Sequence, residues 1–115
     1  MKRSYIYGVD FDGTLCEDAW PEIGKPNLKL IDFLKERRKE GDSVILITMR
    51  EGYKLDEALK WCKRFGLIFD AVNDNLPVMK GFYGNNPRKV FANAYIDDHN
   101  IKGIWADGLP YKSDI

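Results

Sequence analysis

Two carboxylates that lie two residues apart near the start of the chain are the residues best suited to chemistry. The stretch 5–14 reads YIYGVDFDGT, so Asp10 ends an apolar run and Asp12 lies in the turn that follows. Because side chains alternate along a strand, such residues can face the same crevice. Two close carboxylates repel each other unless a cation or a proton separates them. The pair therefore indicates either a solvated acidic turn or a metal-dependent site.

Polar residues also end the later apolar segments of the chain. They are Thr48 after SVILIT, with Arg50 beside it; Asn73 and Asp74 after segment 67–72; and Asp97 and Asp98 after segment 90–96. In an open parallel sheet, ligands bind outside the carboxyl ends of the strands. Packing alone does not explain why several strands should end in such residues, so the pattern favours a functional site.

The elements that position these residues alternate between strands and helices. Buried strands are predicted at 4–10, 43–48, 67–72 and 90–96, and helices at 28–40 and 54–65, with Asn27 as the cap of the first helix. Breakers in 15–26 indicate a turn or small flap beside the aspartates, and 76–88 holds at most a short helical turn before a loop. Alternating strands and helices predict an α/β fold with a parallel sheet and right-handed crossovers.

Length and composition predict one globular domain, 1–115, rather than a disordered chain. Lys plus Arg and Asp plus Glu each number 18, so the net charge is zero and gives no signal for nucleic acid. No apolar run is long enough for a membrane span. Cys16 and Cys62 form no disulfide framework or zinc motif, and we expect reduced thiols in a cytoplasmic protein.

The motifs, in their order, resemble the haloacid dehalogenase (HAD) superfamily of aspartate-nucleophile phosphatases. They are DFDGT at 10–14, Thr48, Lys89 and IDD at 96–98, and the resemblance covers essentially the whole chain. It is closest to small bacterial and phage HAD-like hydrolases. It implies a three-layer Rossmann-like core with a small parallel sheet and a flap after the first strand. Too few residues separate the motifs for a cap domain.

The resemblance also assigns catalytic roles. Asp10 matches the nucleophile that forms an aspartyl-phosphate, and Asp12 the general acid/base that protonates the leaving oxygen and then activates water. Thr48 matches the hydroxyl that binds a phosphoryl oxygen. Lys89 matches the lysine that binds phosphate, but a full strand over 90–96 would place it about 25 Å from Asp97. Lys80 is therefore the alternative.

The same positions form an acidic environment of oxygen ligands, which favours Mg²⁺ over zinc. The metal ligands implied are Asp10, the carbonyl of Asp12, and Asp97 or Asp98, with the choice within the last pair left open. Arg50 could contact a substrate phosphate or form a surface ion pair with Glu51 or Glu57.

The expected function is that of a Mg²⁺-dependent phosphatase that hydrolyses a phosphomonoester through an intermediate on Asp10. The alternatives are a nucleotidase of narrow specificity and a non-catalytic module that binds phosphate or a nucleotide. The phosphorylated substrate is not identified by the sequence. Without a cap, the open site must be covered by the flap, the tail or a second subunit of a homo-oligomer.

Overall fold

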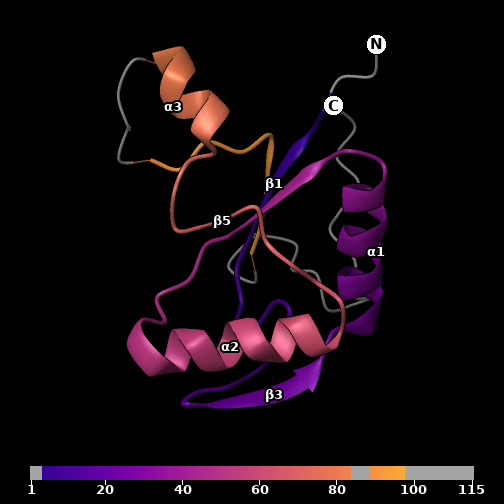
Figure 1. Cartoon of the computed structure of the whole chain (residues 1–115). Helices are drawn as coiled ribbons and strands as arrows, with labels where there is room; N and C mark the ends of the chain where they lie inside the picture. Colours follow the sequence, from indigo (N-terminus) through magenta and orange to yellow (C-terminus); the bar gives the residue numbers. More distant parts are fainter. Residues whose placement is uncertain (1–3, 84–88, 98–115) are drawn as a thin grey trace.

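The computed structural model describes residues 4–83 and 89–97 (Figure 1). Its strands are β1 (Ile6–Val9), β2 (Cys16–Ala19), β3 (Glu22–Pro26), β4 (Ser43–Leu46), β5 (Ala71–Val72) and β6 (Ala94–Ile96), and its helices are α1 (Leu28–Lys39), α2 (Gly52–Arg64) and α3 (Pro77–Tyr83). Four strands form a parallel sheet in the order β5-β4-β1-β6, while β2 and β3 form an antiparallel hairpin. The predicted α/β fold with a small parallel sheet is confirmed.

The helices cover the two faces of this sheet unequally. Alternate residues of β4 belong to different clusters: Val44 and Leu46 pack with buried residues of α1 and α2, whereas Ile45 packs with Met79 of α3. Two helices therefore cover one face and α3 contacts the other. This division follows from right-handed crossovers. The connections through α1 and α2 step across the sheet from β1 to β4 and then to β5, whereas the connection through α3 runs in the reverse direction, to β6 on the other side of β1.

Helix α1 follows the signals in its sequence. The side chain of Asn27 accepts a hydrogen bond from the backbone N–H of Leu30 at 3.2 Å and caps the first turn. Three basic residues occupy the last turn, where their charges interact favourably with the helix dipole. Gly41 follows the helix with a φ of 96°, a conformation that glycine adopts easily. Helix α2 begins two residues before the predicted start at Lys54 and ends at Arg64.

The strand predicted at 67–72 is wrong in extent, since only Ala71–Val72 is strand. The reason lies at Asp70. Its carboxylate accepts the backbone N–H of Val44 at 2.8 Å and also receives the guanidinium of Arg38. A side chain thus satisfies a donor that a longer β5 would have bonded through its backbone.

The strand predicted at 90–96 is also too long, since β6 is only Ala94–Ile96. The side chain of Asn75 bonds the backbone of the preceding segment, accepting from Phe91 N–H at 2.7 Å and donating to the carbonyl of Lys89 at 3.4 Å. The hydroxyl of Tyr95 bonds both Val90 and Ala92. The chain from Lys89 to Ala92 therefore folds back on these side chains, and the contact with β1 begins at Asn93, whose N–H donates to the carbonyl of Ile6 at 2.8 Å.

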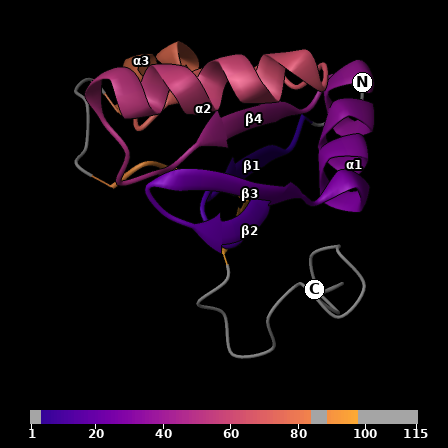
Figure 2. The same ribbon diagram turned by 90° about the horizontal axis from the view of Figure 1, so that it is seen from below.

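The hairpin of β2 and β3 lies across the end of the sheet at which β1 stops (Figure 2). A tight turn leads into it, in which the carbonyl of Phe11 accepts the N–H groups of Thr14 and Leu15 at 3.1 and 2.9 Å. Gly13 makes this turn with a φ of 81°, a conformation that a side chain would strain. The turn places Asp10 and Asp12 between the sheet and the hairpin.

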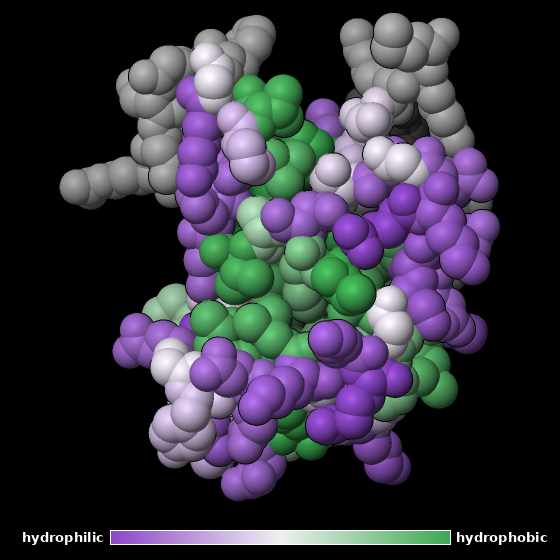
Figure 3. All heavy atoms as spheres, viewed as in Figure 1, coloured by the Kyte–Doolittle hydropathy of each residue, from purple (hydrophilic) through white to green (hydrophobic). Residues whose placement is uncertain are grey.

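Apolar residues gather in the middle of the face shown in Figure 3, between α2 and α3. Leu59, Phe69 and Val72 line a groove of about 270 Å³ there, beside the edge strand β5. Whether a second subunit covers this or any other surface stays a prediction. Within the described ranges, no helix has the length and apolar character needed to cross a bilayer.

Candidate active site

A cavity of about 400 Å³ opens at the carboxyl ends of β1 and β4. It is lined by Asp10, Asp12, Asp18, Trp20, Thr48, Met49 and Arg50. Four of these residues, Asp10, Asp12, Thr48 and Arg50, were predicted as site residues from the sequence. The other three, Asp18, Trp20 and Met49, were not, because exposed side chains of these types carry no signal of their position relative to the cavity.

Asp10 and Asp97 occupy matching positions on neighbouring strands. Val9 of β1 pairs in parallel with Ile96 of β6, and the N–H of Asp10 donates to the carbonyl of Ile96 at 3.0 Å. The next residue on each strand is an aspartate. The register therefore brings these two carboxylates to the same edge of the sheet.

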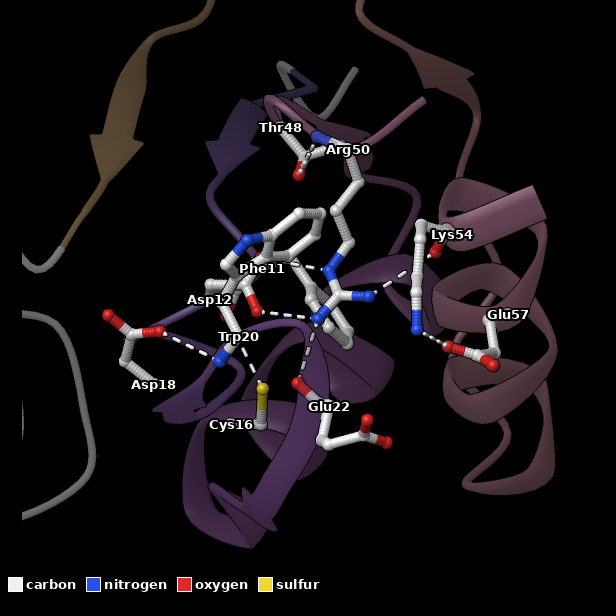
Figure 4. A network of polar contacts seen from close by, with 10 residues as sticks. All are labelled: Phe11, Asp12, Cys16, Asp18, Trp20, Glu22, Thr48, Arg50, Lys54 and Glu57. Carbon is white, nitrogen blue, oxygen red and sulfur yellow. Dashed lines mark hydrogen bonds and ion pairs between the residues drawn. The ribbon is translucent and has the colours of Figure 1, made fainter. Parts of the chain in front are cut away.

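Asp12 forms a two-pronged ion pair with Arg50 (Figure 4). Arg50 Nε donates to Asp12 Oδ2 and Nη2 donates to Oδ1, both at 2.8 Å. Such fork-shaped pairs are among the stronger hydrogen-bonded contacts in proteins. From the sequence, Arg50 was predicted either to contact a substrate phosphate or to form a surface ion pair with Glu51 or Glu57. In the structure it forms its ion pair with Asp12 instead. Contact with a substrate phosphate stays a prediction.

The guanidinium of Arg50 also joins several segments of the chain. It donates to the backbone carbonyls of Glu22 in the hairpin, at 3.0 Å, and of Lys54 in α2, at 3.4 Å. It lies over the rings of Phe11 and Trp20, with its central carbon 5.0 and 4.9 Å from their centroids. Arg50 is only 2% exposed. The hydrogen bonds that Arg50 donates to Asp12 raise the pKa of Arg50, although burial opposes this.

Thr48 presents its hydroxyl at the mouth of β4. Its Oγ1 accepts the backbone N–H of Arg50 at 3.1 Å, and its own N–H donates to Oδ1 of Asn73 at 2.8 Å. The hydroxyl proton can therefore be donated to a ligand oxygen. Asn73 has a φ of 50°, in the left-handed region. The sequence placed Asn73 at a strand end without showing that it positions Thr48.

The two candidate lysines lie in different surroundings, and neither is among the described residues that line the cavity. Lys80 Nζ forms an ion pair with Asp74 at 2.7 Å. Lys89 Nζ lies 5.6 Å from the ring centroid of Tyr95. Because the segment before β6 folds back, the extended strand that would have carried Lys89 about 25 Å from Asp97 is absent from this part of the structure.

Cys16 lies beside the backbone of the turn that follows Asp10, but it is poorly suited to nucleophilic attack. It is fully buried, and its Sγ lies 3.8 Å from the carbonyl of Phe11. Burial raises the pKa of Cys16 to about 11, so its thiol is protonated at neutral pH. Cys62 is also buried and free.

Carboxylates supply the candidate metal ligands of the cavity. Among the residues that the structure describes, no group of three or more His, Cys, Asp or Glu side chains is arranged around a common point. Mg²⁺ is often bound through only one or two carboxylates, together with water and substrate phosphate. Asp10 lines the cavity and can supply one such carboxylate. Asp97 follows the strand that pairs with β1, but it is not among the residues that line the cavity. The fourth predicted ligand, Asp98, lies outside the described residues.

No family model matches the chain, and no curated protein matches it. Among solved structures, the chain is similar to one described as the conserved protein coded by a locus from Bacteroides thetaiotaomicron. The TM-score is 0.76 and the sequence identity 40%, over 89% of this chain and 82% of that chain. At this identity and coverage the likeness extends beyond the fold, and the chain belongs to the same family as this conserved Bacteroides thetaiotaomicron protein.

Proposed function

We propose that the protein is a Mg²⁺-dependent phosphatase of the HAD type, a phosphoric monoester hydrolase. The observation that carries this proposal is the single cavity that holds Asp10, Asp12 and Thr48. These residues come from separate positions around β1 and β4. They correspond in order and chemistry to the nucleophile, the acid/base and the phosphate-binding hydroxyl of that superfamily. The β2–β3 hairpin would be its flap, and no cap domain is proposed.

In the proposed reaction, a carboxylate oxygen of Asp10 attacks phosphorus and the bond from phosphorus to the leaving oxygen breaks. Asp12 donates a proton to that leaving oxygen. Water then attacks the phosphorus of the aspartyl-phosphate while Asp12 accepts its proton, which releases phosphate and restores Asp10. Thr48 donates its hydroxyl to a phosphoryl oxygen in both steps.

Asp10 and Asp97, with the backbone carbonyl of Asp12, would hold Mg²⁺. When bound, this ion would offset the negative charge of the phosphate and of the nearby carboxylates. The carboxylate of Asp12 is used by Arg50, which leaves its backbone oxygen for the ion. Asp98 belongs to the same proposed set through its place beside Asp97.

Lys89 is the proposed phosphate-binding lysine. Lys80 is held by a carboxylate at 2.7 Å, and leaving Asp74 would cost it an ion pair. Lys89 contacts an aromatic ring, a partner worth about 0.5–1 kcal/mol at an exposed site. The side chains of Lys80 and Asp74 are 38% and 43% exposed, so their ion pair is worth a similar amount. The choice of Lys89 therefore rests on its place before IDD in the order of the motifs, and Lys80 stays the alternative.

Metal removal tests the proposed function. Phosphate release from 4-nitrophenyl phosphate is expected to stop when EDTA is present and to return when excess Mg²⁺ is added, because the carboxylates and the phosphate repel each other without a cation. The rate of phosphate release is the measurement. Equal rates with EDTA and with Mg²⁺ would contradict the metal assignment, and no release in either would contradict the phosphatase itself.

One observation favours a second candidate, a phosphate-binding module without turnover. Both carboxylate oxygens of Asp12 are engaged by Arg50, and a carboxylate in this state has no proton to donate. A phosphatase requires Asp12 to be protonated while a single oxygen keeps the contact with Arg50. If Mg²⁺ and fluoroberyllate together raise the melting temperature while phosphate release is absent, the binding module is the better description.

A further inference from the structure

The cavity has an apolar end as well as a polar one. Asp10 and Thr48 are half-buried just beyond the ends of β1 and β4, and we call them the polar end. Trp20 of the hairpin turn and Met49 are the exposed apolar residues of the same lining, and we call them the rim. Trp20 is 57% exposed and Met49 is 97% exposed. Exposing large apolar side chains to water is unfavourable, and adjacent exposed apolar residues often mark a binding site. Here two such residues border the same cavity.

The indole of Trp20 is held on one side. The guanidinium of Arg50 lies over the ring at 4.9 Å, and that guanidinium is itself fixed by Asp12 and by the carbonyl of Glu22 (Figure 4). The backbone N–H of Trp20 donates to Oδ1 of Asp18 at 3.3 Å, which holds the main chain of the turn. The contact with Arg50 gives the ring a defined position, and the exposure of the ring leaves surface available for a second flat group.

The direction of the proposed reaction relates this rim to the substrate. In phosphoryl transfer the attacking and leaving oxygens are roughly in line with phosphorus. A phosphate at the polar end, attacked from Asp10, therefore directs its leaving group away from the floor of the sheet and toward the rim. The rim is where the protein meets the part of the substrate that is not phosphate.

We propose that Trp20 and Met49 form a subsite for an aromatic leaving group, so that the substrate is a phosphate monoester of a neutral alcohol bearing an aromatic ring. This proposal rests on the phosphatase function proposed above. Stacking on an indole is tolerant of the identity of the ring, because every aromatic ring presents a π face. The carboxylate of Asp18 in the same lining disfavours leaving groups that carry a further negative charge.

Phosphonates that cannot be hydrolysed test the subsite separately from catalysis. With Mg²⁺ present, 2-phenylethylphosphonate is expected to bind about tenfold more tightly than propylphosphonate, as one stacked ring provides in other sites. The dissociation constants are measured by calorimetry. In Trp20→Ala the ratio of the two constants is expected to fall to near one, and Met49→Ala is expected to reduce it.

Tyr53→Ala is the matched control. Tyr53 is another exposed aromatic residue nearby in the chain, 74% exposed, but it is not part of the lining of the cavity. Its removal is expected to preserve the ratio. Using a ratio also separates the subsite from damage to Arg50, because a disturbed Arg50 weakens both phosphonates equally, while loss of the subsite weakens only the aromatic one.

The outcomes distinguish this proposal from the function on which it rests. Equal affinity for the two phosphonates in the wild-type protein, or an unchanged ratio in Trp20→Ala, overturns the subsite even if phosphate esters are hydrolysed. A tenfold preference that depends on Trp20, in a protein that hydrolyses no phosphate ester, supports the subsite and overturns the phosphatase.

Discussion

Replacing Asp10 with asparagine is expected to lower kcat/KM for 4-nitrophenyl phosphate by at least about 10³-fold, because an amide cannot replace the carboxylate as nucleophile. The fold should persist. The contact that anchors this position, from the N–H of Asp10 to the carbonyl of Ile96 at 3.0 Å, is made by the backbone. Steady-state phosphate release and a thermal melt of the same preparation measure the two quantities.

Asp18→Asn is the matched control for this loss. Asp18 also lines the cavity and is an exposed residue of the hairpin. Its proposed part is to disfavour charged leaving groups, and it takes no part in the bond-breaking steps with the neutral leaving group used here. We expect a change of only a few-fold, since a single exposed charge is largely screened. If Asp10→Asn were no more harmful than Asp18→Asn, the nucleophile would have to be another group.

Replacing Arg50 with methionine is expected to destabilise the protein by about 3 kcal/mol, the lower end of the cost of breaking a buried pair. The low end applies because the Asp12 side chain is 22% exposed and can regain some water. The substitution also leaves the carbonyls of Glu22 and Lys54 without this donor. Urea unfolding, followed by circular dichroism, gives the change in the free energy of unfolding.

Arg38→Met provides the comparison. Arg38 makes a similar two-pronged contact with Asp70, at 3.2 and 2.9 Å, but its side chain is 33% exposed. Its loss is expected to cost less than about 1 kcal/mol. If both variants unfold at the same urea concentration, the contacts of Arg50 with the hairpin, the turn after β1 and α2 do not stabilise the fold more than the exposed contact of Arg38, which would contradict this prediction.

The sequence predicted the elements whose signals are local. Helix α1 begins after the capping side chain of Asn27 and ends before Gly41, as expected. The apolar run predicted as a strand at 43–48 contains β4, which is buried at Val44, Ile45 and Leu46 and ends at Leu46, two residues earlier than predicted. Such features depend on residues that are neighbours in the chain, so propensity and hydrophobic pattern are sufficient to find them.

The features that the sequence missed depend on contacts between distant residues. The last predicted strand is shortened because Asn75 bonds Phe91 across 16 positions. Arg50 meets Asp12 across 38 positions and also bonds the carbonyl of Glu22 in the hairpin. In the sequence Arg50 is one polar residue after a strand. Its burial and its choice of partner are set by tertiary packing, which no local pattern encodes.

The most direct measurement of the central claim is chemical trapping of the intermediate. Protein mixed with a phosphate monoester and Mg²⁺ is quenched in acid, reduced with borohydride, which converts an aspartyl-phosphate to homoserine, and sequenced by mass spectrometry. We predict homoserine at position 10 and nowhere else, with none in Asp10→Asn. Phosphate release without modification at position 10 would contradict the proposed mechanism.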